Sequence, residues 1–304
     1  METTLFENMA IYEIILLLLG CLLFLISLVG IVIGMIRNQS LKKYLPLLFI
    51  AIVMIGFPSI KKLSLGNDFI SIEKDSNAFM NDPSNQDLLT KLADNYKKIN
   101  PDELKTPQDL TSYAKMAMLL GDNDVALKYV NIALEIDKNY GPAVDIKNQI
   151  ESNLAIKQLT MEPENDTLRS SVTRHLQILE NGQSRNTYQS LKIAEGHLLT
   201  GNTASAKVEA DKVIAKNPNQ KQAQQIIQLA GVEEKIKKAK ESPENKSELR
   251  YAVQNFKEIS SNTHQKAYNS AIIAKAYKVL GDQKTSEKYK DSVKFFLAKP
   301  VYKH

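Results

Sequence analysis

Few side chains in this sequence are of the kinds that act as nucleophiles, metal ligands or general bases. The histidines are scattered, at His175, His197, His264 and His304, and no two form an HxxxH or HxxEH pattern that would hold zinc. The single cysteine, Cys21, lies within an apolar run, where burial disfavours the reactive thiolate. We therefore expect no metal centre, and we expect the histidines to serve in packing or at the surface.

The sequence also lacks the short motifs in which a loop performs chemistry. It contains no GxxxxGK[ST] loop for phosphates, no GxGxxG at the start of a helix and no serine in a GxSxG turn. Glu233 and Glu234 are adjacent carboxylates, but they stand beside Lys235 and other lysines, which is typical of a solvated helix face. We expect no catalytic residues and no cofactor, and hence a protein that is not an enzyme.

Composition favours helices and excludes several classes of protein. Gly (12) and Pro (10) are sparse among 304 residues, Trp is absent and aromatic residues make up 7%, so an aromatic-rich β fold is disfavoured. With one cysteine the chain cannot form a disulfide framework. The net charge of +5 is too small to indicate binding to nucleic acid.

Two apolar runs near the N-terminus are candidate membrane spans. Residues 14–36 form a run of 23 residues without a charge, which crosses a hydrocarbon core of about 30 Å at about 1.5 Å per residue. Residues 44–60 give a shorter second run, with Pro46 and Pro58 near its ends. We predict a membrane anchor over residues 1–62, formed by a tight hairpin of two transmembrane helices.

The flanking charges bear on how this anchor is processed and oriented. A cleaved signal peptide is disfavoured, because the N-terminus is acidic and the first run is too long. Basic residues are balanced between the connector, from Arg37 to Lys43, and the segment after the second run. Charge density in the short connector favours placing it in the cytoplasm. We therefore expect an inner (plasma) membrane protein whose main domain is extracytoplasmic, or periplasmic.

Gly30 and Gly34 form a GxxxG pair in the first apolar run. Small residues at this spacing allow two helices to approach closely. Three interpretations stay open: packing on the second span, no packing role, or homodimerisation through the first transmembrane helix.

A repeat follows the anchor. Gly121, Gly201 and Gly281 each end a helix-like run and are spaced 80 residues apart, and a Pro-x-Asn marker at Pro83, Pro163 and Pro243 keeps the same step. A fixed period indicates a repeat array. Residues 66–73, which precede it, are expected to form a brief strand or a linker.

The clearest unit spans residues 107–140. Thr106 precedes Pro107 as a helix cap, apolar residues follow at steps of three and four, and Gly121 supplies a turn before a second amphipathic helix. With small residues at Ala114, Gly121, Ala126 and Ala133, this unit resembles a tetratricopeptide repeat of 34 residues in two antiparallel helices. Residues 187–220 and 267–300 resemble it in the same way.

Longer helix pairs are expected between these units, at about 142–180 and 219–259, each turning where the proline of the marker opens the next helix. The resemblance implies an all-α fold, a TPR-like α-solenoid that follows two transmembrane helices. The boundaries are a juxtamembrane linker over residues 63–83 and a helical repeat domain over residues 84–304.

The resemblance also implies a concave groove as the site for partner proteins or peptides. Positions on the first helix of each pair would line it, and in this sequence they include Gln108, Lys115, Tyr188, Glu195, Tyr268, Lys275 and Lys278. Tyrosine suits peptide recognition because it combines a flat apolar ring with a polar tip. Partner binding elsewhere, or packing of these residues within the domain, are the alternatives.

The sequence therefore predicts a bacterial-type, membrane-anchored scaffold that binds protein partners in the cell envelope, in an assembly or secretion role. A second hypothesis is a sensor or effector whose helical domain detects a signal and whose transmembrane hairpin oligomerises through Gly30 and Gly34. The identity of the partner is not encoded in any motif of the sequence.

Overall fold

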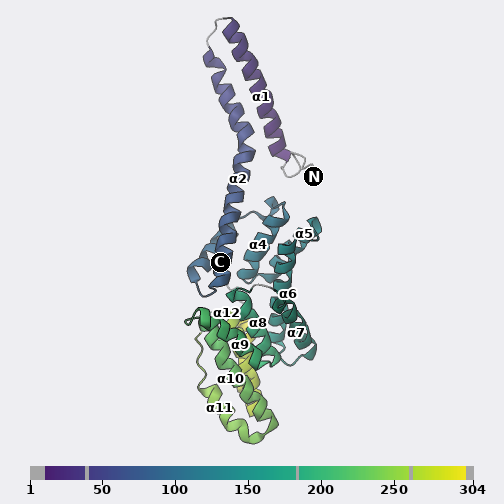
Figure 1. Cartoon of the computed structure of the whole chain (residues 1–304), viewed down its shortest axis with the longest axis vertical. Coiled ribbons are helices and arrows are strands. Elements are labelled where there is room, and N and C mark those ends of the chain that lie inside the picture. Colours follow the sequence, from purple (N-terminus) through teal and green to yellow (C-terminus); the bar gives the residue numbers. More distant parts are fainter. Residues whose placement is uncertain (1–10, 38–40, 183–184, 260–262, 299–304) are drawn as a thin grey trace. The chain divides into compact units, whose positions relative to one another are not determined.

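The computed structural model describes residues 11–37, 41–182, 185–259 and 263–298. For residues 11, 13, 41, 57–68 and 263 it describes the backbone only. Every regular element in these ranges is a helix, as expected for an all-α protein (Figure 1). The chain divides into two compact units, Met1–Ser71 and Ile72–His304, which are described separately below.

The first unit consists of two long helices joined by a short connection. Helix α1 (Ile11–Ile36) is followed by the short helix η1 (Leu41–Lys43) and by the first part of α2 (Leu45–Asn81), which returns alongside α1 (Figure 1). A Cβ at Gly30 would lie 2.5 Å from the ring of Tyr44, so this glycine lets the connection approach α1. Gly30 is thus covered by Tyr44 of the same chain, and Gly34 is buried.

Helix α1 contains the one segment of the described chain that is long and apolar enough to cross a membrane, Ile14–Ile36, with a mean hydropathy of 3.1. Within the residues described with their side chains, the second apolar stretch covers Leu45–Gly56 and does not by itself reach the length of a bilayer span. The last residues of the second span predicted at 44–60 have side chains outside the described part of the chain.

Residues 63–81 are helical, where the sequence predicted a linker or a brief strand. Within the second unit α2 buries Ile72, Ser76 and Phe79, which follow one another at steps of four and three. This spacing keeps them on one face of a helix, so packing of that face accounts for the helical conformation.

The second unit continues as a succession of helices that pack mainly on their neighbours (Figure 1). Three pairs coincide with the predicted repeat units. They are α4 (Pro107–Leu119) with α5 (Asn123–Ile136), α8 (Thr187–Thr200) with α9 (Thr203–Lys216), and α12 (Thr263–Leu280) with α13 (Gln283–Leu297). Between them lie α6 (Gly141–Met161) with α7 (Asp166–Glu180), and α10 (Lys221–Glu241) with α11 (Lys246–Gln254). Helix α3 (Gln86–Lys98) and the short helices η2 (Pro101–Glu103) and η3 (Pro243–Asn245) complete the unit.

The 80-residue step corresponds to a repeated turn. Gly121, Gly201 and Gly281 have φ angles of 86°, 87° and 87°, a left-handed conformation that glycine adopts without steric cost. The following Asp122, Asn202 and Asp282 each cap the next helix through a side-chain oxygen. The turns predicted at the three glycines are therefore confirmed.

The Pro-x-Asn markers also lie between helices, but the proline does not open the long helix that follows. Asn85 and Asn165 are the caps, and their side chains accept hydrogen bonds from backbone N–H groups of α3 and α7. At the third marker Pro243 begins the short helix η3, and α11 starts after Asn245. The asparagine carries the capping role because its side chain can accept these bonds, which proline cannot do.

Candidate functional site

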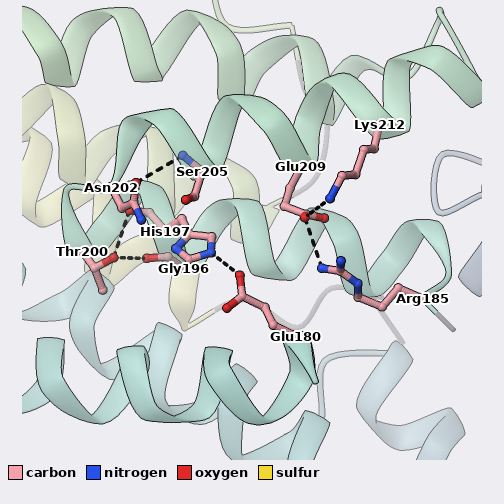
Figure 2. A network of polar contacts seen from close by, with 9 residues as sticks. All are labelled: Glu180, Arg185, Gly196, His197, Thr200, Asn202, Ser205, Glu209 and Lys212. Atoms are coloured by element: carbon pink, nitrogen blue, oxygen red, sulfur yellow. Dashed lines mark hydrogen bonds and ion pairs between the residues drawn. The ribbon is translucent and has the colours of Figure 1, made fainter. Parts of the chain in front are cut away.

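Two groups of polar contacts hold α8 to its neighbours (Figure 2). His197 Nε2 lies 2.6 Å from Glu180 Oε1 at the end of α7. Arg185, in the connection before α8, lies 3.1 Å from Glu209 Oε1 of α9, which also binds Lys212 Nζ at 2.6 Å. These contacts hold α8 between α7 and α9. They thereby also fix the positions of the α8 residues that line the sites described below.

The predicted groove residues on α4 do not lie together with the others. Gln108 is exposed, and Lys115 donates to Asn77 Oδ1 of α2 at 2.6 Å. Burial lowers the pKa of Lys115, and the Glu73 carboxylate opposes this effect. The end of α2 is therefore in contact with one position that was expected to face a partner.

Tyr188, Glu195 and Tyr268 line one partly open pocket of about 70 Å³, called the polar cavity below. The Tyr268 hydroxyl donates to the backbone carbonyl of Glu195 at 3.1 Å, although the two residues are 73 positions apart. The Glu195 carboxylate accepts from Lys192 Nζ at 2.8 Å and from Gln222 Nε2 at 2.7 Å. Other polar residues on the wall are Asn153, Lys157 and His264.

Burial and charge shift the pKa values around this cavity. Burial, reinforced by Glu195 and Glu233, raises the pKa of Tyr268 well above its ordinary value. Burial acts to lower the pKa of Lys192, but the charge of Glu195, the neighbouring Tyr188 and the hydrogen bond to Glu195 together outweigh it, so this pKa is raised. Burial, Lys192 and Lys157 together lower the pKa of His264 to about 4. The imidazole is therefore neutral at pH 7, close to two ammonium groups.

Lys275 and Lys278 line a different and larger depression of about 660 Å³, called the lysine-rimmed hollow below. It lies between the turn that joins α6 to α7 and the pair α12–α13. Its apolar lining comes from Met161, Pro163, Ala271, Ala274 and Val293, and its charged lining from Glu162, Glu164, Lys275, Lys278, Lys290 and Lys294. Its volume is within the range of about 300–1,000 Å³ of known ligand pockets.

Ion pairs organise the rim of the hollow. Lys278 Nζ lies 2.6 Å from Glu164 Oε2, and Lys275 pairs with Glu233 of α10. The hydrogen bond from Lys278 is the main reason why the pKa of Glu164 is lowered, and the charges of Lys240 and Lys290 add to it. Lys290 and Lys294 also pair, with Glu287 and Asp291 of their own helix. Each of the four lysines of the lining therefore has a carboxylate partner within the chain.

Several residues of the polar cavity were not predicted from the sequence, namely Asn153, Lys157, Lys192, Gln222 and His264. Part of the signal was present, since Tyr188, Lys192 and Glu195 are spaced by four and three and so share one helix face. The contributions of α6, α10 and α12 depend on how the helices pack, and no local pattern shows this.

Comparison with known proteins found no match among protein-family models, curated proteins or solved structures. Within the described residues there is no group of three or more His, Cys, Asp or Glu side chains that could hold a metal ion. Of the predicted partner-binding residues, Tyr188, Glu195 and Tyr268 thus line the polar cavity, and Lys275 and Lys278 line the lysine-rimmed hollow.

Proposed function

We propose that this protein is a membrane-anchored scaffold of the tetratricopeptide type, whose α-solenoid binds an acidic segment of a partner protein in the lysine-rimmed hollow. The observation that carries the proposal is the hollow itself, which combines apolar walls with a rim rich in lysine. Two of the predicted partner-binding residues, Lys275 and Lys278, lie in it.

The walls of the hollow suit an apolar side chain of a peptide. Met161 is 50% exposed at its edge, while Ala271, Ala274 and Val293 are almost fully buried beneath. The small alanine side chains leave room between the helices. An acidic segment would bind the four lysines of the lining by replacing the carboxylates with which they pair in the free chain. Apolar contact surface surrounded by a polar rim is the usual arrangement of a protein interaction site.

The first unit supports the anchor. Leu25, Val29 and Phe49 are 59%, 58% and 69% exposed, and many other apolar side chains of α1 and α2 also point outward. Such a surface is unfavourable in water but suits lipid. We propose that α1 crosses the inner membrane and that residues 44–60 form a second span beside it, with the helical domain on the extracytoplasmic side.

The position of Gly30 favours a tether over an oligomerising sensor. The Tyr44 ring of the same chain covers Gly30, so this position is not open to a second copy. Membrane attachment raises the local concentration of the helical domain near other envelope proteins, so each contact in the hollow can be weak.

A photo-crosslinking residue in place of Met161 tests the partner site in intact cells. We expect a discrete adduct with one protein, which weakens when Lys278 and Lys290 are both changed to Glu, because reversed charges repel an acidic segment. The matched control is the same crosslinker in place of Val208, which is 53% exposed on α9 and lies outside the hollow. Equal adducts from both positions would contradict the proposal.

Protease treatment of spheroplasts tests the side of the membrane. A chain with a C-terminal tag should lose the tag when intact spheroplasts are treated, because the helical domain lies outside the inner membrane. Protection of the tag until the cells are lysed would place the domain in the cytoplasm.

A further inference from the structure

The chain leaves α7 through an asparagine that is followed by a glycine. Asn181 is the C-cap of α7, and Asn181-Gly182 is the one Asn-Gly pair in the sequence. Both residues are exposed, and no hydrogen bond joins the Asn181 side chain to another residue that the structure describes. The Gly182 N–H donates to the Leu179 carbonyl only at the long distance of 3.4 Å. The side-chain amide of Asn181 and the backbone nitrogen of Gly182 are therefore both weakly held.

Asn255, the C-cap of α11, is a close comparison because its backbone is held in the same way. Both caps have a right-handed helical backbone conformation, and both donate their N–H to carbonyls four and two positions earlier. Both are also exposed. The Asn255 side chain differs, since its Nδ2 donates to the Tyr251 carbonyl at 2.8 Å, and the bulky Phe256 follows it. The two caps thus differ in the freedom of the amide and in the size of the next residue.

An asparagine whose amide is free reacts with the backbone of the residue that follows it, which is one reason why asparagine is thermolabile. The Gly182 nitrogen attacks Asn181 Cγ, and a new C–N bond forms. The bond from Cγ to Nδ2 breaks, and ammonia leaves with the proton of the Gly182 nitrogen. Water then opens the cyclic imide at either of its carbonyl carbons, which gives aspartate or isoaspartate. Glycine favours the ring closure because no Cβ hinders it and its backbone is permissive.

We propose that Asn181 is a site of spontaneous deamidation, and that the product loosens the connection from α7 to α8. Either product places a carboxylate at the C-terminal end of α7, where the helix dipole disfavours negative charge. This carboxylate adjoins Glu180, whose Oε1 lies 2.6 Å from His197 Nε2 (Figure 2). Isoaspartate also lengthens the main chain just before Arg185, whose contact with Glu209 holds the same connection. The modification does not depend on the function proposed for the lysine-rimmed hollow.

Ageing of the full chain in detergent, in a mildly alkaline buffer, tests the reaction. Peptide mass spectrometry follows the conversion of the amide into a carboxylic acid at Asn181 and, as the matched control in the same sample, at Asn255. We expect Asn181 to react at least about tenfold faster, with isoaspartate as well as aspartate among its products. Equal rates at the two caps would overturn the proposal. So would aspartate without isoaspartate, because direct hydrolysis of the amide gives aspartate alone.

Two variants separate the reaction from its consequence. Gly182→Ala should slow the reaction about tenfold, since the added Cβ hinders ring closure; this Cβ would lie 3.3 Å from the Leu179 carbonyl oxygen, which a small shift of the exposed turn relieves. Asn181→Gln keeps an amide but disfavours the ring. Aged wild type should melt up to about 3 °C below fresh protein, whereas aged Asn181→Gln should melt as fresh protein does. The proposal is overturned if Gly182→Ala reacts as fast as the wild type, or if both aged proteins lose the same stability.

Discussion

Among single residues, His264 is one whose protonation should couple to stability at acidic pH. Its pKa is lowered from 6.5 to about 4 in the folded chain, so between these values the unfolded chain binds the proton more readily. The contribution of the neutral imidazole to stability is therefore complete above pH 6.5 and is lost as the pH falls towards 4. We expect the loss to reach at most about 3 kcal/mol.

Urea unfolding followed by circular dichroism at pH 7 and pH 5 measures this effect. His264→Gln keeps a polar side chain that does not titrate, so the variant should lose less stability than the wild type over this interval. An equal loss in both proteins would show that other groups cause the pH dependence.

Two glycines should respond to alanine with opposite signs. Gly201 has a φ of 87°, and the space that a methyl group would occupy there is open to a distance of 4 Å, so Gly201→Ala should cost about 1 kcal/mol through backbone strain alone. Gly231 lies inside α10, also with open space around it, so Gly231→Ala should stabilise by about 0.5–1 kcal/mol. Thermal unfolding of both variants checks the pair, and destabilisation of the same size in both would refute the backbone explanation.

At the level of elements, the end of α2 is an integral part of the second unit. Phe79 is 4% exposed and lines the polar cavity together with Met118 of α4. We expect Phe79→Ala to destabilise the domain by about 3 kcal/mol, because a buried aromatic ring is removed. Denaturant unfolding measures this, with Tyr251→Ala, at a residue 69% exposed on α11, as the control.

For Tyr251→Ala the change should stay within about 0.5 kcal/mol. If Phe79→Ala is as mild as this control, the last turns of α2 do not contribute to the core. The segment would then be closer to the linker that the sequence predicted.

Sequence patterns predicted the elements well where local chemistry decides them. The pair at residues 107–136 was expected from a threonine cap, a proline at the first helical position and a glycine turn, and α4 and α5 follow these signals. The helical conformation of residues 63–81 was missed, because the apolar face of this segment is stabilised by packing on distant helices.

At the scale of the whole molecule, the sites depend on packing and could be predicted only in part. Tyr188 and Tyr268 were both expected to line the groove, but their positions in the sequence do not reveal whether that helix face meets solvent or another helix. In the structure Tyr268 is 3% exposed, and its hydroxyl donates a hydrogen bond to the backbone carbonyl of Glu195 in α8. Lys275 and Lys278 remain at an open depression, which is why partner binding is proposed there.

The central claim is that a membrane tether delivers the lysine-rimmed hollow to its partner. The most direct test compares the adduct formed by a crosslinker in place of Met161 in the full chain and in a chain that lacks residues 1–36, at equal protein levels. We predict a clear adduct from the full chain in the membrane fraction and a strongly reduced one without α1, because the tether sets the local concentration. An equal yield from both chains would contradict the account.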